Sequence, residues 1–199
     1  MKKILVIKAH PREESFCNAL VARYIDGAKA SGAEVKVLNL RELELEPWLK
    51  YEWGGGHDSL PDSDDLEHAK ELIEWSEHIM FAYPIYWAMP PALLTLFIEL
   101  VTASGFAFKY RKPLFGIIPR WDKLLAGRTA SVISTMDAPP LFFELHDHDP
   151  AGKMLKDVLR FTGIRLVGKY YFGSVVLSGE KRKARWLEKA FAIGKTEGR

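Results

Sequence analysis

Polar side chains gather just after the first apolar run of the chain, around a predicted helix start. His10, Ser15 and Asn18 combine an imidazole, a hydroxyl and an amide with the backbone N–H groups of Phe16 and Cys17. N–H groups in a first helical turn have no acceptor within the helix and carry partial positive charge, which favours a bound phosphate. Ser15 and Asn18 are also common at ordinary helix starts, so simple capping stays the alternative.

A second segment places two large aromatic side chains among prolines. It reads Tyr83-Pro84-Ile85-Tyr86-Trp87-Ala88-Met89-Pro90-Pro91 and follows a predicted strand. Prolines restrict the backbone, aromatic faces can line a slot, and N–H groups can bond the polar edge of a heterocycle. We therefore expect this segment to hold a flat ring. The alternative is that Tyr86 and Trp87 pack over the edge of the sheet.

Other kinds of site have little support in the residue pattern. The run His146-Asp147-His148-Asp149 puts four potential ligands on neighbouring residues that cannot all point at one ion, so we expect no metal. Cys17 has no evident base to activate it, which favours packing over reactivity. The chain has no Gly-x-Ser-x-Gly elbow, no P-loop and no dinucleotide-binding glycine fingerprint.

Short apolar runs alternate with stretches of helical spacing along the chain. Strands are predicted at residues 4–7, 35–38, 79–83, 129–135 and 167–172. Helices are predicted at about residues 16–28, 66–75 (with capping residues at 62–65), 91–101, 154–162 and 180–193. Five β–α units imply an α/β fold whose parallel sheet is covered on both faces. Ligands bind at the carboxyl ends of such strands, so the loops at 10–18, 84–90 and 135–148 should form the site.

Composition narrows the class of protein further. The chain has 199 residues, 48% of them hydrophobic, and 28 Lys and Arg against 26 Asp and Glu, as in an ordinary globular domain spanning residues 1–199. The small net charge predicts no nucleic-acid partner, and no apolar run is long enough for membrane insertion. A single cysteine allows no intrachain disulfide, which favours a cytoplasmic setting.

Several motifs together carry a resemblance to one family. They are His10-Pro11, Ser15-Phe16, Tyr83-Pro84-Ile85-Tyr86-Trp87, Pro90-Pro91-Ala92-Leu93-Leu94 and Gly105-Phe106-Ala107-Phe108. In these the chain resembles the flavodoxin-like NAD(P)H:quinone oxidoreductases over nearly its whole length. Three later motifs resemble the bacterial branch: Ser134-Thr135-Met136-Asp137-Ala138-Pro139-Pro140, Phe161-Thr162-Gly163-Ile164 and Tyr171-Phe172-Gly173-Ser174.

The resemblance implies a flavodoxin-like three-layer αβα sandwich with strand order 2-1-3-4-5, and a flavin cofactor, either FAD or FMN. It implies that the phosphate end is held by His10, Ser15, Phe16 and Asn18. The ring would be held by Pro84, Ile85, Tyr86, Trp87, Thr135, Met136 and Asp137. NAD(P)H would donate hydride and leave, and a quinone would then accept two electrons in the same slot. Family members are commonly homodimers with the active site at the subunit interface.

The chain departs from the family pattern at three places. Cys17 stands where many members have Asn, and Met136-Asp137 stands where animal-type members have a Gly pair. A Tyr that steadies charge in those members is replaced by Phe142 here. The same members use a His together with that Tyr, and His148 matches it here. His148 and Tyr86 are therefore the candidate catalytic residues.

The resemblance also leaves rival readings of the function. One is a flavin-binding regulatory or accessory protein that acts through a partner such as an ion-efflux system. A one-electron carrier of the flavodoxin type is less favoured, because such carriers are typically acidic. The loop at residues 47–65 is expected to be either a lid over the flavin or part of a dimer surface.

Overall fold

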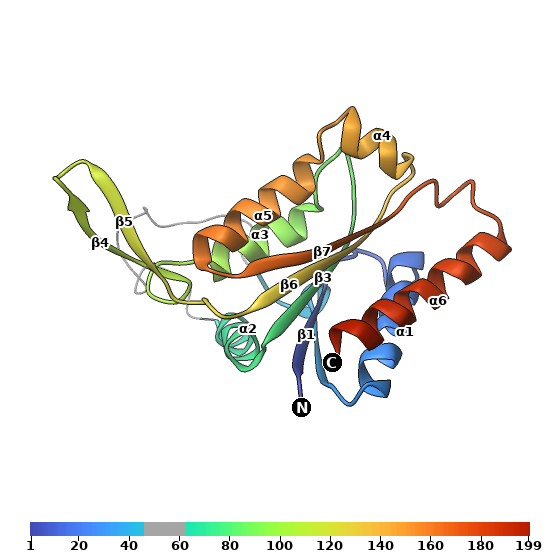
Figure 1. The fold of residues 1–199 in the computed structure, drawn as a ribbon, viewed down its shortest axis with the longest axis horizontal. Helices are drawn as coiled ribbons and strands as arrows, with labels where there is room; N and C mark the ends of the chain where they lie inside the picture. Colours follow the sequence, from blue (N-terminus) through green and yellow to red (C-terminus); the bar gives the residue numbers. More distant parts are fainter. Residues whose placement is uncertain (46–62) are drawn as a thin grey trace.

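The core of the protein is a five-stranded parallel sheet (Figure 1). The computed structural model describes residues 1–45 and 63–199, so the predicted loop at 47–65 lies almost entirely outside the described residues. The strands are β1 (Lys3–Lys8), β2 (Glu34–Asn39), β3 (His78–Pro84), β6 (Thr129–Thr135) and β7 (Arg165–Phe172). Their order is β2-β1-β3-β6-β7, which confirms the predicted 2-1-3-4-5 arrangement of parallel strands.

The burial of each strand matches its pattern of apolar residues. Every residue of β3 is buried, and so are the apolar residues of β1 from Ile4 to Ile7, because helices cover both faces of the sheet. Edge strand β7 instead alternates between exposed and partly buried residues along most of its length. Continuous apolar runs therefore mark the central strands, as expected for parallel sheets.

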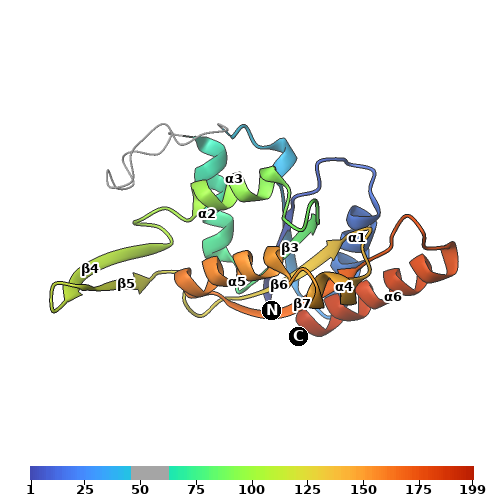
Figure 2. The same cartoon turned by 90° about the horizontal axis from the view of Figure 1, so that it is seen from above.

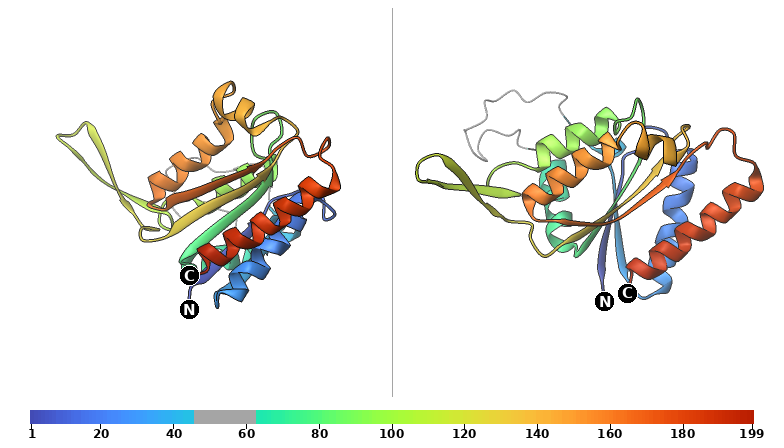
Figure 3. Two further views of the ribbon diagram at one scale, coloured as in Figure 1. Left: turned by 45° about the vertical axis from the view of Figure 1, so that its right-hand side comes forward. Right: turned by 45° about the horizontal axis from the view of Figure 1, so that its top comes forward.

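Two layers of helices enclose the sheet, as Figures 2 and 3 show. On one face lie α1 (Phe16–Ala30) and α6 (Glu180–Glu197). The two helices pack closely because Gly27 and Gly194 have no Cβ; a Cβ at either position would overlap the backbone of the facing helix. The other face carries α2 (Asp64–Trp75), α3 (Ala92–Val101) and α5 (Pro150–Thr162). Ser15 and Ser63 cap α1 and α2, accepting from the N–H groups of Asn18 and Leu66. No helix among the described residues is long and apolar enough to cross a membrane.

Several elements differ from the sequence-based expectation. An antiparallel hairpin, β4 (Phe108–Leu114) and β5 (Ile118–Lys123), and the short helices η1 (Leu40–Glu42) and α4 (Pro140–Leu145) were not predicted. Helix α5 begins at Pro150 rather than Met154, because Asp149 caps it and accepts from the Gly152 N–H at 2.9 Å. Helix α6 continues past Ile193 to Glu197.

That last turn of α6 carries a carboxylate into a buried polar cluster. Glu197 Oε2 accepts hydrogen bonds from the hydroxyls of Tyr24 (2.7 Å) and Ser131 (2.8 Å) and lies 3.1 Å from Nε2 of His78. Tyr170 donates to the other carboxylate oxygen at 3.1 Å. Burial raises the pKa of Glu197, but the hydrogen bonds and charge of these partners outweigh burial and lower it overall. The cluster ties the end of α6 to three strands of the sheet.

We predict that Glu197→Gln lowers the free energy of unfolding at pH 7 by about 1–3 kcal/mol, since it weakens several buried hydrogen bonds to a charged group. A carboxylate with a lowered folded-state pKa stabilises the fold above its unfolded pKa, and this contribution is lost as the pH falls through the folded pKa. The difference between variant and wild type should therefore shrink in acid. Urea unfolding from pH 7 to pH 3 measures it, with the exposed Glu188→Gln as control. Equal effects of the two substitutions at pH 7 would contradict this role.

Candidate active site

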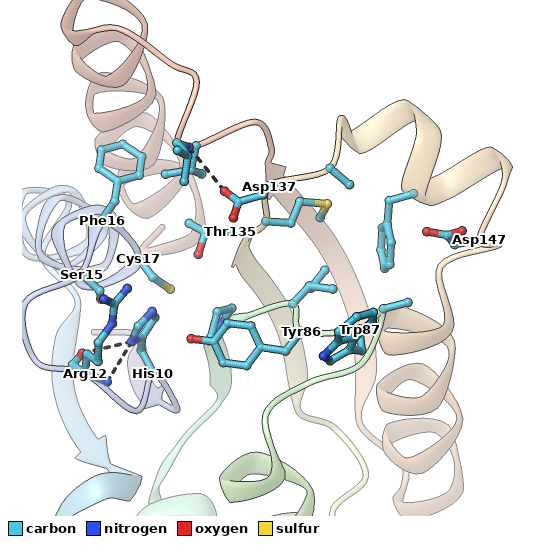
Figure 4. A pocket seen from close by; sticks show the side chains of 18 residues that line it. His10, Arg12, Ser15, Phe16, Cys17, Tyr86, Trp87, Thr135, Asp137 and Asp147 are labelled. Atoms are coloured by element: carbon cyan, nitrogen blue, oxygen red, sulfur yellow. Dashed lines mark hydrogen bonds between the residues drawn. The ribbon is translucent and has the colours of Figure 1, made fainter.

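A pocket of about 700 Å³ opens at the carboxyl edge of the sheet (Figure 4). This volume lies within the range of typical small-molecule sites. The pocket is bounded by the loops after β1, β3, β6 and β7, the position predicted from the fold class. The predicted site residues that line it are His10, Ser15, Phe16, Pro84, Ile85, Tyr86, Trp87, Thr135, Met136 and Asp137.

The loop after β1 supplies the donors at one end of the pocket. Phe16 and Cys17 occupy the first two positions of α1, so helix geometry leaves their N–H groups without an intrahelical acceptor. Nδ1 of His10 contacts the backbone of Arg12, at 3.0 Å from its nitrogen and 3.1 Å from its carbonyl oxygen, so this backbone orients the ring. Burial lowers the pKa of His10. This end therefore combines helix N–H groups, the His10 imidazole and the Arg12 guanidinium, and it is suited to a phosphate.

Asn18 braces this loop rather than lining the pocket. Its side-chain amide donates to the backbone carbonyls of Glu13 (2.8 Å) and Arg12 (3.2 Å), and its own N–H donates to Ser15 Oγ at 3.2 Å. The amide nitrogen is thus occupied within the loop, and Asn18 is absent from the residues that line the pocket. The contact to a ligand expected from Asn18 therefore has no support in this geometry.

The loop after β3 forms a tight, strained turn. Tyr86 and Met89 exchange two backbone hydrogen bonds of 2.9 Å, while Trp87 and Ala88 between them have φ angles of 51° and 63°. Such angles cost non-glycine residues about 1–2 kcal/mol each and persist where the surroundings impose them, often at functional sites. The Ile85 N–H donates to the Thr135 carbonyl at 2.8 Å, anchoring the turn to β6. The turn holds Trp87 at the mouth of the pocket with 99% of its surface exposed.

The loop after β6 is anchored by its backbone and by an aspartate. The Met136 N–H donates to the Phe172 carbonyl at 3.0 Å, and Asp137 Oδ1 accepts from the Val176 N–H at 3.4 Å. These bonds join the loops after β6 and β7 into one wall of the pocket. Val175 and Val176 belong to that wall but were not predicted, although the rule that ligands bind at carboxyl strand ends also applies to β7.

Further along, Asp149 holds the connection between α4 and α5. It is buried in the left-handed region with φ of 51°, accepts from the Tyr171 hydroxyl at 2.8 Å and forms an ion pair with Lys169. As a result Asp147, not His148, lines the pocket, and His148 is exposed. The structure therefore brings no support for contact between His148 and a ligand, and its catalytic role stays a prediction.

Further pocket residues lie in the loops that were predicted to form the site, but they were not named as individual ligands. They are Arg12, Ala88, Ala138, Phe143 and Asp147. Cys17, whose N–H was part of the predicted helix start, also lines the pocket. No cluster of potential metal ligands occurs among residues 1–45 and 63–199.

Comparison with known proteins connects this chain to one family and several relatives. A family profile described as "Flavodoxin-like fold" matches residues 2–194. An "FMN-dependent NADH:quinone oxidoreductase" from Macrococcus caseolyticus is 25% identical, covering 98% of this chain and 100% of its own length. A human "Ribosyldihydronicotinamide dehydrogenase [quinone]" is 24% identical, covering 98% of this chain and 94% of its own.

Solved structures share the fold. An "NAD(P)H:quinone oxidoreductase from Methanothermobacter marburgensis" superposes with a TM-score of 0.79 at 19% identity and covers 98% of both chains. An azoreductase from Bacillus anthracis superposes with a TM-score of 0.75 at 17% identity, covering 98% of this chain and 100% of its own. At these identities the likeness shows the fold alone.

The reactivity of the Cys17 thiol provides a test of the pocket's structure. Burial raises the pKa of this thiol, a side-chain hydrogen bond with Thr135 lowers it, and the effect of burial is the larger, so the pKa is about 12. At pH 8 about one thiol in 10⁴ is then ionised, so we expect the folded protein to resist a disulfide reagent and the unfolded protein to react at once. Colour release from Ellman's reagent with and without guanidinium measures both rates. Rapid reaction of the folded protein at pH 8 would contradict the packing role of Cys17.

Proposed function

The chain belongs to the family of proteins with the flavodoxin-like fold, and from this premise we propose that it is a flavin-dependent NAD(P)H:quinone oxidoreductase. One observation carries the proposal: a single pocket joins a cationic, donor-rich end at α1 to a strained aromatic turn after β3. The name of the relative from Macrococcus caseolyticus, which this chain matches over 98% of its length, supports the same activity.

The residues present fit a flavin. A phosphate would accept from the N–H groups of Phe16 and Cys17, next to the Arg12 guanidinium and the His10 imidazole. The walls of the remaining pocket are largely apolar, as an aromatic ring system requires. They include Pro84, Ile85, Tyr86, Trp87, Met136, Ala138 and Phe143. We propose FMN in particular, because the relative that supports the activity is named for it.

Each part of the pocket has a separate task in this function. When bound, the flavin supplies the hydride chemistry that neither side chains nor backbone can perform. The helix start and Arg12 hold its phosphate, while the turn at Trp87 fixes the position of the ring. Thr135 and Asp137 present a hydroxyl and a carboxylate from the β6 wall, where they can bond polar edges of the ring or of the nicotinamide and quinone. The fixed walls orient donor and acceptor in turn within one slot.

We also propose that the protein acts as a homodimer in the cytoplasm. Two apolar side chains that line the pocket, Trp87 and Val176, are exposed. Further exposed apolar side chains lie on α4 and in the loop after β7, and so many exposed apolar groups are unusual for a monomer. They are Leu141, Phe142, Leu145 and Leu177. The lone cysteine supports a reducing compartment. No observation on the described residues favours an accessory protein over an enzyme.

Anaerobic spectroscopy tests the proposed function directly. We expect the purified protein to carry, or take up, FMN, and its visible absorbance to bleach with NADH or NADPH and return when a soluble quinone is added. Bleaching without recovery would contradict the proposal that a quinone is the electron acceptor. A protein that takes up neither FMN nor FAD would refute the flavin assignment.

We predict that Trp87→Ala weakens FMN binding by about tenfold or more, because it removes a large aromatic wall beside the ring. Fluorescence quenching of FMN by the apoprotein measures the dissociation constant. Trp75→Ala is the matched control, since Trp75 lies at the end of α2 against Lys3 and Lys36 and away from the pocket. Trp186 is unsuitable as a control because it packs on Phe16. Equal affinities of the Trp87 and Trp75 variants would contradict the placement of Trp87.

A further inference from the structure

The β4–β5 hairpin extends away from the body of the protein and ends in an apolar tip (Figures 1 and 2). We call residues 113–119 the hairpin tip; none of these seven residues has a polar side-chain atom. Phe115 is 83% exposed and Ile117 is 81% exposed, with Leu114 and Ile118 exposed beside them. A concentrated apolar tip normally marks an interaction site. The partner of the hairpin must therefore offer an apolar phase or surface.

Basic side chains lie directly behind the tip. The hairpin contains five of them and one acidic residue, Asp122, which pairs with Arg111 at 2.7 Å. We call the five the basic collar; they are Lys109, Arg111, Lys112, Arg120 and Lys123. At about 3.4 Å per strand residue, Arg111 and Arg120 lie about 7–10 Å behind the last paired apolar residues of the tip. That spacing is similar to the thickness of the polar headgroup layer of a bilayer.

Two features of the hairpin are unfavourable within a single chain. Arg111 and Arg120 are directly opposite each other in the antiparallel ladder, and like charges in that position repel. Phe115 has a left-handed backbone with φ of 53°, which is uncommon for a bulky residue. Burial offsets neither feature, because every residue from Lys109 to Arg120 is exposed. An anionic partner with an apolar layer compensates for both, since it neutralises the opposed arginines and takes up the Phe115 ring.

A cleft at the base of the hairpin provides a place for an anionic group. It has a volume of about 490 Å³ and lies between β5 and the carboxyl end of α5. Its lining consists of Arg120, Trp121, Lys123, Asp157, Arg160 and Phe161. Trp121 stacks on Phe161 at 4.5 Å, which holds the base of the hairpin against α5. The guanidinium groups of Arg120 and Arg160 form no ion pair with any described residue, so both are available to a phosphate.

We propose that the β4–β5 hairpin docks on an anionic lipid surface. The tip enters the boundary between headgroups and acyl chains, the basic collar lies among the lipid phosphates, and the cleft receives one such phosphate. This contact holds the protein on a membrane and does not span it. A protein partner matches the hairpin less well, because it would need an apolar depression encircled by carboxylates. An anionic bilayer offers both layers at every point of its surface.

The consequence of this contact rests on the proposed function and concerns the class of acceptor. The thirteen residues of α5 place the cleft about 20 Å from the connection that carries Asp147 at the pocket, so docking leaves the pocket open. Quinones with an apolar side chain partition into membranes, and a protein held there meets them at a raised effective concentration. The acceptor therefore belongs to the class of lipophilic quinones.

Sedimentation with lipid vesicles tests the contact without flavin or quinone. We expect the protein to bind vesicles of phosphatidylcholine with phosphatidylglycerol at least about tenfold more tightly than vesicles of phosphatidylcholine alone, and to leave them at high salt. Phe115→Ser/Ile117→Ser in the tip should weaken binding to the anionic vesicles at least about tenfold. Val37→Ser/Val167→Ser is the matched control, because it changes exposed valines on the two edge strands of the sheet, and it should bind like wild type.

The basic collar is tested in the same way with the tip unchanged. Lys112→Glu/Arg120→Glu should weaken binding to anionic vesicles at least about tenfold. Lys181→Glu/Arg185→Glu makes the same change of charge at exposed positions of α6 and should stay within about twofold of wild type. Inorganic phosphate at constant ionic strength should not release the protein from the vesicles. Release would show that the cleft takes free phosphate, and it would overturn the assignment to lipid.

Each further result supports or overturns the proposal. Equal binding to neutral and anionic vesicles, or equal binding of hairpin and control variants, would overturn it. A change of oligomeric state in the hairpin variants, measured by light scattering, would also overturn it, because the hairpin would then be a protein contact. If circular dichroism shows that one hairpin variant is unfolded, the other variant decides.

Turnover separates this inference from the proposed function. Reduction of a long-chain quinone in anionic vesicles should fall at least about tenfold in the collar variant, while reduction of a soluble quinone stays unchanged. Unchanged turnover of the long-chain quinone would refute the assigned class of acceptor. A protein that binds anionic vesicles as expected but reduces no quinone would refute the proposed function and leave the membrane contact standing.

Discussion

The parallel pairing of β1, β3 and β6 is the constraint on which the rest of the structure depends. Because these strands are neighbours in the order β2-β1-β3-β6-β7, their carboxyl ends meet at one edge, and the three loops that follow must turn there. Helices on both faces bury the strands and leave the backbone no other route. Residues more than a hundred positions apart, such as His10 and Asp137, reach one pocket for this reason.

The pocket then depends on groups that hold its loops in costly conformations. Trp87 and Ala88 adopt left-handed backbone angles, and they are kept there by the paired hydrogen bonds of Tyr86 and Met89. Asp149 adopts the same region in the connection between α4 and α5, where its buried carboxylate bonds to Lys169, Tyr171 and the start of α5. Loops anchored in this way can present a flat slot and a donor-rich end without rearranging when a ligand binds. Among the described non-glycine residues with positive φ, all but Phe115 thus lie at the edge where the chemistry is proposed.

The sequence predicts most of this arrangement, for identifiable reasons. Apolar runs such as Ile4 to Ile7 and serine caps such as Ser15 are local signals, and the structure confirms the elements that they indicate. The hairpin lacked such a signal, since its strands are exposed and are interrupted where Pro113 cannot donate a hydrogen bond. Whether Asp147 or His148 faces the pocket depends on the backbone angles set by buried Asp149, a tertiary effect that no local pattern encodes.

Calorimetric titration of the apoprotein with FMN and with riboflavin tests the central claim most directly. The two molecules share the ring and differ in the phosphate, which we assign to the N–H groups of Phe16 and Cys17 and to Arg12. We predict that FMN binds at least about 100-fold more tightly than riboflavin, a difference of about 2.7 kcal/mol, since charge-assisted hydrogen bonds in a partly buried site are lost with the phosphate. Equal affinities for the two would contradict the assignment of this pocket.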